Sequence, residues 1–176
     1  PDVLLLIEPH ESWTDTLAVL HPNFPYRHDA FRGEGLAIPL WSRLPLIDPE
    51  TRYLVSDRRA SIWSRLEWPD GRTVNLVGLH PTPPGLQDST GEDRRDSRER
   101  DAELVRVARE ISERPDEEWI VAGDFNDVAW SHTTRLFKRL SGLSDPRIGR
   151  TFMGTYIAWL PPFRCPIDHI FLSQGF

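Results

Sequence analysis

The chain has 176 residues, with 21 Lys and Arg, 27 Asp and Glu, and a net charge of −6. This acidic balance argues against a long nucleic-acid footprint, because phosphate contacts need cations gathered on one face, but it does not exclude a short phosphoester substrate. No apolar run approaches the roughly 18 residues needed to cross a bilayer, and the lone Cys165 excludes an internal disulfide and a thiolate zinc site. We expect one globular domain over residues 1–176, and we find no visible targeting signal in these residues.

The first third of the chain predicts a strand, a helix and a second strand. Residues 3–7 form a continuous apolar run, typical of a strand buried on both faces, that ends at Glu8. A helix entered through Pro9 is then predicted by one apolar stripe, formed by Trp13, Leu17 and Leu20. Residues 35–41 predict another strand, which Pro39 marks as an edge or bulged strand.

The middle of the chain predicts a β-hairpin followed by a long loop and a helix. Apolar residues alternate over residues 61–68, residues 69–72 supply turn chemistry, and residues 73–80 return as a second strand. Residues 81–95 carry three Pro and two Gly and predict a loop, and loops of that length are often functional. A mixed-charge helix follows, with one apolar face formed by Leu104, Ala108 and Ile111.

The last third predicts two strands separated by a helix. Residues 119–122 form a short buried strand, and residues 167–172 form a final strand. Between them Ser131 is a suitable N-cap for a helix that carries Leu136, Phe137 and Leu140. Strands, a hairpin and helices in this mixture indicate an α/β or α+β layered domain.

The sharpest candidate for chemistry is Gly123-Asp124-Phe125-Asn126, directly after a predicted buried strand. A carboxylate and a carboxamide two residues apart at a strand end are placed to line a cleft. The alternative is an ordinary turn, since Gly, Asp and Asn all favour turns. The spacing alone leaves both interpretations open.

Three further polar residues lie at or within predicted strands. Glu8 ends the first strand, and is either a solvated strand terminus or a ligand for a hard cation. His80 follows Val-Gly-Leu, where a neutral imidazole either donates to a phosphoryl oxygen or sits hydrogen-bonded at the sheet edge. Asp168 lies inside an apolar strand and therefore needs a partner, which cannot be the adjacent His169 because neighbouring side chains point to opposite faces.

Taken together, these residues offer oxygen ligands but no tetrahedral Cys/His zinc set, which favours magnesium or manganese. The chain lacks the G-x-x-x-x-G-K-[ST] phosphate loop, the G-x-S-x-G elbow and the dinucleotide fingerprint. Hydrolysis assisted by a hard metal ion remains as the interpretation.

These segments, in this order, resemble the endonuclease/exonuclease/phosphatase superfamily with its DNase I-like fold. The family shares an acidic residue after an early strand, a histidine-bearing strand, a G-D-F-N motif and an I-D-Y-I-F-like strand. The matching stretches are residues 2–8, 35–46, 75–84, 121–127 and 167–173. The chain is more closely similar to a bacterial branch in which this domain follows membrane segments, through residues 80–84, 100–104, 127–131 and 133–137.

The resemblance implies a role for each candidate residue. Glu8 corresponds to the principal metal ligand, with Asn126 helping to hold metal or phosphate. Asp124 would align or activate the attacking water and contribute to the metal site, and His80 would contact the scissile phosphate. Asp168 corresponds to the carboxylate that orients a catalytic histidine, as an Asp does in a catalytic triad.

The chain departs from the family pattern at both ends. The family's first strand, bearing an Asn near the metal, would precede Pro1, and its Ser-Asp-His strand would follow Phe176, so we expect a domain that lacks its first and last strands. An alternative takes His169 as the Ser-Asp-His histidine, although the trailing Ile-Phe-Leu-Ser fits the earlier strand better. Without that histidine we expect weakened catalysis, because a general base contributes about 10² to 10⁴ in rate.

The resemblance implies a four-layer α/β sandwich of two packed sheets flanked by helices. The expected activity is hydrolysis of a phosphoester with Mg²⁺ or Mn²⁺ as cofactor. The substrate is a nucleic acid, a phospholipid headgroup or a small phosphodiester, and the acidic chain favours the latter two. The rival is a binding or scaffold domain of the same fold that has lost its chemistry. The related branch also implies an extracytoplasmic domain tethered to a bacterial membrane by segments outside these residues.

Overall fold

The computed structural model describes residues 1–30, 36–84, 96–147, 149, 154–156 and 164–176. The first half of the chain contains β1 (Val3–Leu5), α1 (Thr14–Ala18), β2 (Tyr26–His28), β3 (Leu40–Ser42), β4 (Leu46–Arg52), β5 (Ser61–Glu67) and β6 (Thr73–Leu79). The second half contains α2 (Arg98–Ser112), β7 (Trp119–Asp124), α3 (His132–Ser141) and β8 (Asp168–Leu172). Short 3₁₀ helices, η1 (Glu11–Trp13) and η2 (His21–Asn23), flank α1. Within the described residues, no helix is long and apolar enough to cross a membrane.

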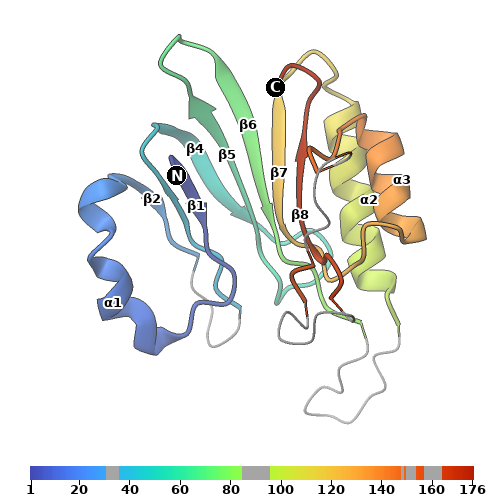
Figure 1. Cartoon of the computed structure of the whole chain (residues 1–176), viewed down its shortest axis with the longest axis horizontal. Helices are drawn as coiled ribbons and strands as arrows, with labels where there is room; N and C mark the ends of the chain where they lie inside the picture. Colours follow the sequence, from blue (N-terminus) through green and yellow to red (C-terminus); the bar gives the residue numbers. More distant parts are fainter. Residues whose placement is uncertain (31–35, 85–95, 148, 150–153, 157–163) are drawn as a thin grey trace.

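The strands form two sheets that pack face to face. The smaller sheet has the order β1-β3-β2, and the larger has the order β4-β5-β6-β7-β8. Figure 1 shows α1 beyond the small sheet and shows α2 and α3 beyond the large one. The predicted α/β sandwich of two packed sheets flanked by helices is confirmed.

Alternating side chains of the large sheet supply two separate cores. Ile62, Leu66 and Leu76 point toward the small sheet, where they pack with Leu5 and other apolar residues. The side chains next to them in sequence point toward α2 and α3, as is the case for Trp63, Val77 and Val121. The central strands β5 and β6 are therefore buried on both faces over most of their length, as expected when a sheet lies between two other layers.

The two sheets approach each other closely at Gly78 in β6. A Cβ atom built on Gly78 would lie 2.7 Å from Cδ1 of Leu5 in β1. Any larger residue would have to displace the Leu5 side chain, in the strand that leads to Glu8. Glycine at this position therefore allows β1 to pack closely on β6.

Most elements predicted from the pattern are confirmed. The hairpin is formed by β5 and β6, and the mixed-charge helix is α2. Ser131 caps α3, since its hydroxyl accepts a hydrogen bond from the backbone N–H of Thr134 at 2.9 Å. The predicted strands near residues 119–122 and 167–172 are β7 and β8.

Other expectations are wrong or only partly right. The predicted stripe on the first helix does not reach a core, because α1 has no buried residue and Trp13 is 58% exposed. β1 is half-buried instead of buried on both faces. β3 begins after Pro39 and lies in the centre of its sheet, not at an edge. Proline removes only a backbone N–H, and the carbonyl of Pro39 still accepts a hydrogen bond from the N–H of Leu6 at 3.0 Å.

Two strands were not predicted, and one predicted loop lies mainly outside the described residues. The pattern missed β2, which is short, and β4, which contains Pro49. β4 tolerates this proline because it lies at the edge of the sheet and its register shifts between Ile47 and Glu50. Of the predicted loop at 81–95, only residues 81–84 are described.

Candidate active site

Three of the predicted site residues meet at one edge of the large sheet. His80 directly follows β6, Asp124 ends β7 and Asp168 begins β8. β6 and β7 are parallel, with Leu79 opposite Gly123, so both strands end at this edge. β8 runs antiparallel to β7 and places Asp168 directly opposite Asp124.

Glu8 reaches the same edge from the small sheet. Its backbone is in the left-handed region, with φ of 52°, and its N–H donates to the carbonyl of Ala37 at 3.0 Å. Its side chain is 46% exposed, and Oε1 lies 3.4 Å from Nε2 of His80. The two sheets therefore both contribute to one site.

Arg59 is a site residue that the sequence reasoning missed. Its Nη1 lies 3.1 Å from Oε1 of Glu8 and within 3.1 Å of both ring nitrogens of His80. The side chain is only 15% exposed. No motif marks it, because it sits in a charged stretch before β5 that is typical of a solvated loop. The usable signal is its position directly before a strand whose start is buried.

His80 is a buried, neutral imidazole. It is 4% exposed, and burial, followed by the nearby Arg59 guanidinium, lowers the pKa of His80 to about 3. A neutral ring has one donor and one acceptor nitrogen. His80 is thus suited to hydrogen bonding with a phosphoryl oxygen rather than to carrying positive charge at neutral pH.

The turn after β7 has a backbone that few residues tolerate. Gly123 has φ of 148°, and a Cβ there would lie 1.9 Å from the carbonyl oxygen of Leu79. Asn126 is also left-handed, with φ of 49°. Oδ1 of Asp124 accepts a hydrogen bond from the N–H of Asn126 at 2.7 Å, and Nδ2 of Asn126 donates to the carbonyl of Pro81 at 3.0 Å. The turn is therefore tied both to itself and to the chain that follows His80.

The environment of Asp124 disfavours its ionised form. The pKa of Asp124 is raised to about 6, chiefly by burial and also by the carboxylates of Asp168 and Glu8, although the N–H of Asn126 and the Arg59 guanidinium oppose this shift. Carboxylates gathered at one edge repel one another. A titratable group with a strongly perturbed pKa is a common property of functional sites.

Asp168 and His169 point to opposite faces of β8, as predicted. The Asp168 side chain is exposed, so the expectation that it needs a buried partner is wrong: it sits on the outward face of the strand. His169 is 2% exposed and packs against Phe125 and Phe171. His169 therefore faces the helices, away from Asp168, and its position speaks against its role as the Ser-Asp-His histidine.

The hydrogen bonds of His169 fix its tautomer and give it a structural role. Nδ1 lies 2.8 Å from Nη2 of Arg147, and Nε2 lies 2.8 Å from the carbonyl oxygen of Asp127. A guanidinium only donates, so Nδ1 accepts, and Nε2–H donates to Asp127. Burial lowers the pKa of His169, which keeps this neutral form.

Arg100 holds the same turn from α2. It is 9% exposed, and its Nη1 donates to the carbonyl of Asn126 at 2.8 Å. The Asp127 carboxylate accepts from the hydroxyls of Ser131 and Thr134, which join the turn to the start of α3. Consecutive carbonyls of the turn, at Asn126 and Asp127, are thus clamped by Arg100 and His169. Sequence reasoning gave neither residue this role.

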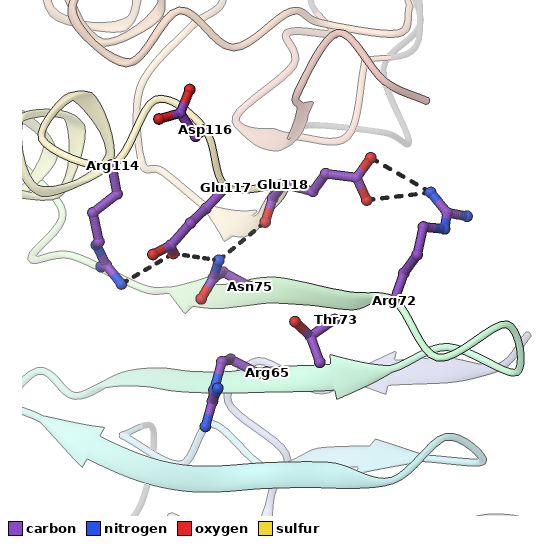
Figure 2. A pocket seen from close by; sticks show the side chains of 8 residues that line it. All are labelled: Arg65, Arg72, Thr73, Asn75, Arg114, Asp116, Glu117 and Glu118. Carbon is purple, nitrogen blue, oxygen red and sulfur yellow. Dashed lines mark hydrogen bonds and ion pairs between the residues drawn. The ribbon is translucent and has the colours of Figure 1, made fainter.

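A hollow of about 540 Å³ lies at the opposite edge of the large sheet, where β6 and β7 begin. Figure 2 shows the side chains that line it: Arg65, Arg72, Thr73, Asn75, Arg114, Asp116, Glu117 and Glu118. Asn75 donates to Glu117 at 2.8 Å, while Arg72 and Glu118 form an ion pair at 3.2 Å. Charges in this hollow compensate one another, in contrast to the crowded carboxylates around Asp124.

The donor set at the Asp124 edge suits a hard divalent cation. Glu8, Asp124, Asn126 and Asp168 offer carboxylate and amide oxygens, which Mg²⁺ and Mn²⁺ prefer. The carboxylates of Glu8 and Asp168 raise the pKa of Asp124, so added positive charge would relieve their repulsion. Within the described residues, however, no three His, Cys, Asp or Glu side chains are grouped closely enough to hold a metal ion. The types of donor atom and their negative charge thus suit a metal ion. The acidic side chains themselves are not close enough together to coordinate one in this conformation.

The whole chain matches the model of a known protein family. The model of the Endonuclease/Exonuclease/phosphatase family matches residues 1–176. The chain belongs to this family. Family membership supports phosphoester hydrolase activity and confirms the resemblance drawn from the ordered motifs. Comparison with curated protein sequences gave no match.

Solved structures of the family share the fold of this chain. TDP2 from D. rerio, in complex with a single-strand DNA product, has a TM-score of 0.74 at 19% identity, covering 100% of this chain and 73% of that one. The human Nocturnin catalytic domain with bound sulfate has a TM-score of 0.68 at 19% identity, covering 99% and 69%. Sphingomyelinase C from Streptomyces griseocarneus has a TM-score of 0.64 at 19% identity, covering 99% and 71%.

Proposed function

We propose that this chain is a divalent-metal-dependent phosphoester hydrolase that uses Mg²⁺ or Mn²⁺. One observation carries the proposal: Glu8, His80, Asp124, Asn126 and Asp168, which lie far apart in sequence, come together where two sheets meet. Their positions agree with the roles that the family resemblance implies. Burial and the neighbouring carboxylates raise the pKa of Asp124, and a bound cation would offset both effects.

Glu8 and Asn126, with Asp124, would hold the metal ion. When bound there, the ion would polarise a phosphoryl oxygen and stabilise its developing negative charge. Glu8 is the half-exposed member of this set, so its carboxylate has room to turn from Arg59 toward a ligand. Its replacement should therefore affect metal binding more than folding.

The remaining residues would act on the substrate and the attacking water. Neutral His80 would donate a hydrogen bond to a phosphoryl oxygen, and the Arg59 guanidinium beside it would attract the same negative charge. Asp124, once ionised, would orient the water through its second oxygen, because Oδ1 already accepts from Asn126. Asp168 would orient the histidine of a Ser-Asp-His segment. His169 is not placed to be that histidine, because its Nε2 bonds the carbonyl of Asp127.

We favour a lipid headgroup or a small phosphodiester over nucleic acid as the substrate. The chain is acidic overall, with a net charge of −6. At the site edge, the Arg100 guanidinium is already bonded to Asn126 and Asp101, which removes it from a basic strip. A sphingomyelinase and a DNA-bound enzyme both share the fold, so the fold itself does not choose between these classes. An extracytoplasmic, membrane-tethered location stays a prediction.

A second candidate function is a binding domain that has lost its chemistry, and one contact favours it. Nη1 of Arg59 lies 3.1 Å from Glu8, the proposed metal ligand, and so supplies positive charge where a metal ion would. If this ion pair persists in solution, it competes with metal binding. The two candidates differ in whether Glu8 binds a divalent cation.

The test is Mn²⁺ binding by calorimetry, together with Mn²⁺-dependent hydrolysis of bis(4-nitrophenyl) phosphate and 4-nitrophenyl phosphate. Glu8→Gln should weaken Mn²⁺ binding at least tenfold and lower hydrolysis, while Glu113→Gln, an exposed change at the end of α2, should do neither. Equal Mn²⁺ affinity in wild type and Glu8→Gln would refute the ligand assignment. Absence of both binding and hydrolysis in the folded wild type would favour the binding domain.

A further inference from the structure

The outward side of α3 carries a concentrated positive charge. His132, Arg135 and Arg139 are exposed and follow the i, i+3, i+7 spacing of one helical face, with half-buried Lys138 at its side. These four residues line a hollow of about 440 Å³, and we call them the basic face. The opposite side of α3 is buried through Thr133, Thr134 and Phe137.

The basic face has no acidic residue in its own helix and no ion pair in the described part of the chain. Residues 131–142 contain no Asp or Glu, in a chain whose net charge is −6. None of the ion pairs found within the described ranges involves a residue of the basic face. Other arginines are paired, as in Arg72 with Glu118 and Arg114 with Glu110. The basic face is therefore positively charged in an acidic chain, and none of its charges takes part in an ion pair among the described residues.

Exposed apolar side chains lie at both ends of this helix. Trp130, two residues before α3, is 54% exposed, and Leu140 in its last turn is 36% exposed. Helices that lie on a bilayer combine cations with Trp and Leu, because the cations attract anionic headgroups while the apolar groups enter the interface. A nucleic-acid backbone would use the cations but would gain nothing from Leu140.

We propose that the basic face, with Trp130 and Leu140, docks the domain on a membrane surface that contains anionic phospholipid. This inference goes beyond the proposed hydrolase function and does not depend on it. α3 starts beside the site: Ser131 and Thr134 donate to the carboxylate of Asp127, three residues after Asp124. Docking through α3 would accordingly bring the Asp124 edge close to phosphoester headgroups.

The test is co-sedimentation with phosphatidylcholine vesicles, with and without phosphatidylserine. The wild type should bind only the anionic vesicles, and binding should weaken as NaCl is raised, because salt screens the attraction. The triple variant Arg135→Gln, Lys138→Gln and Arg139→Gln should bind at least tenfold more weakly, since each charge near an anionic surface contributes about fivefold. Trp130→Ala in the wild type should weaken the vesicle binding that remains at high salt, because that part of the binding is apolar.

A matched control separates position from net charge. Arg43→Gln, Arg65→Gln and Arg98→Gln together remove the same charge from side chains that are 50%, 47% and 90% exposed elsewhere on the surface, and should leave vesicle binding unchanged. Equal loss in both triple variants, or no loss in the α3 variant, would overturn the proposal. So would binding of the wild type to duplex DNA but not to vesicles. Hydrolysis of a small dissolved phosphodiester should be the same in both triple variants, so a failed hydrolase proposal is recognised separately.

Discussion

The two edges of the large sheet use charged residues in opposite ways. At the edge where β6 and β7 begin, the carboxylates and guanidinium groups around Asn75 pair with one another (Figure 2). At the edge where these strands end, burial and repulsion from the carboxylates of Asp168 and Glu8 instead raise the pKa of Asp124. The comparison teaches that the same strands provide a charge-balanced, structural edge and a charge-crowded edge suited to function.

The largest contrast should come from the arginines that serve each edge. Arg100→Ala should lower the free energy of unfolding by about 3 kcal/mol and reduce hydrolysis, because it removes a buried guanidinium that holds the turn of Asn126 and pairs with Asp101 and Asp127. Arg72→Ala, at the opposite edge, should lower the free energy of unfolding far less than Arg100→Ala, since the Arg72 side chain is 48% exposed and its ion pair is screened by solvent. Urea denaturation measures both, and similar losses would contradict the comparison.

Carboxylates should differ in their effect on activity. Asp124→Asn should lower kcat about 100-fold or more, because an amide neither binds cations nor accepts a proton as a carboxylate does. Its free energy of unfolding should not fall, since burial and neighbouring charge oppose ionisation of Asp124. Asp116→Asn at the other edge should leave kcat unchanged. Steady-state hydrolysis by the two variants gives the answer, and loss of folding in Asp124→Asn would show that the residue is structural.

A buried carboxylate beneath the site predicts a pH effect. Glu103 is 1% exposed, its Oε1 has no hydrogen-bond partner among the described residues, and burial raises the pKa of Glu103 to about 7. The folded state thus favours the protonated form, so this group's stabilisation is lost as pH rises from about 4.5 through 7. Glu103→Gln should gain stability relative to wild type by about 2 kcal/mol between pH 5 and pH 8. A pH-independent difference between the two unfolding curves would rule this out.

The smallest effect is expected for the polar network of the balanced edge. Asn75→Ala should lower the free energy of unfolding by about 1 kcal/mol. The change removes the hydrogen bonds that Nδ2 of Asn75 donates to the Glu117 carboxylate and to the carbonyl of Glu118. Hydrolysis should not change, because this edge lies at the far end of β6 from His80. A drop in kcat with an unchanged unfolding curve would show that the two edges are coupled.

Local patterns predicted much of the fold. The β5–β6 hairpin follows from alternation and a turn, and the α3 boundary follows from the Ser131 cap. Local rules missed β4, because Pro49 and acidic residues are typical of a loop and only its place at a sheet edge makes them acceptable. They also overestimated the burial of Trp13, because amphipathic spacing does not state whether a core lies opposite the helix.

Some residues of the candidate site could likewise be predicted from the sequence, and others could not. His80, Asp124 and Asp168 were found because each stands at or within a strand whose apolar residues are evident from sequence. Arg59 was missed because nothing local distinguishes it from a solvated arginine. The role of His169 was also undecided, since the sequence places it beside Asp168 without showing which carbonyl it binds.

The sequence by itself determined the family, the strand ends that carry polar residues, and the alternation that sends Asp168 and His169 to opposite faces. These features depend on spacing along one chain, and strand and helix periods convert that spacing directly into faces. Only the tertiary structure decided that Arg59 stands between Glu8 and His80, that Arg100 and His169 clamp the turn after Asp124, and that the basic face of α3 forms no ion pair with the rest of the described chain. Those contacts join residues 21 to 51 positions apart, and pairing over such distances is set by how the sheets and helices pack.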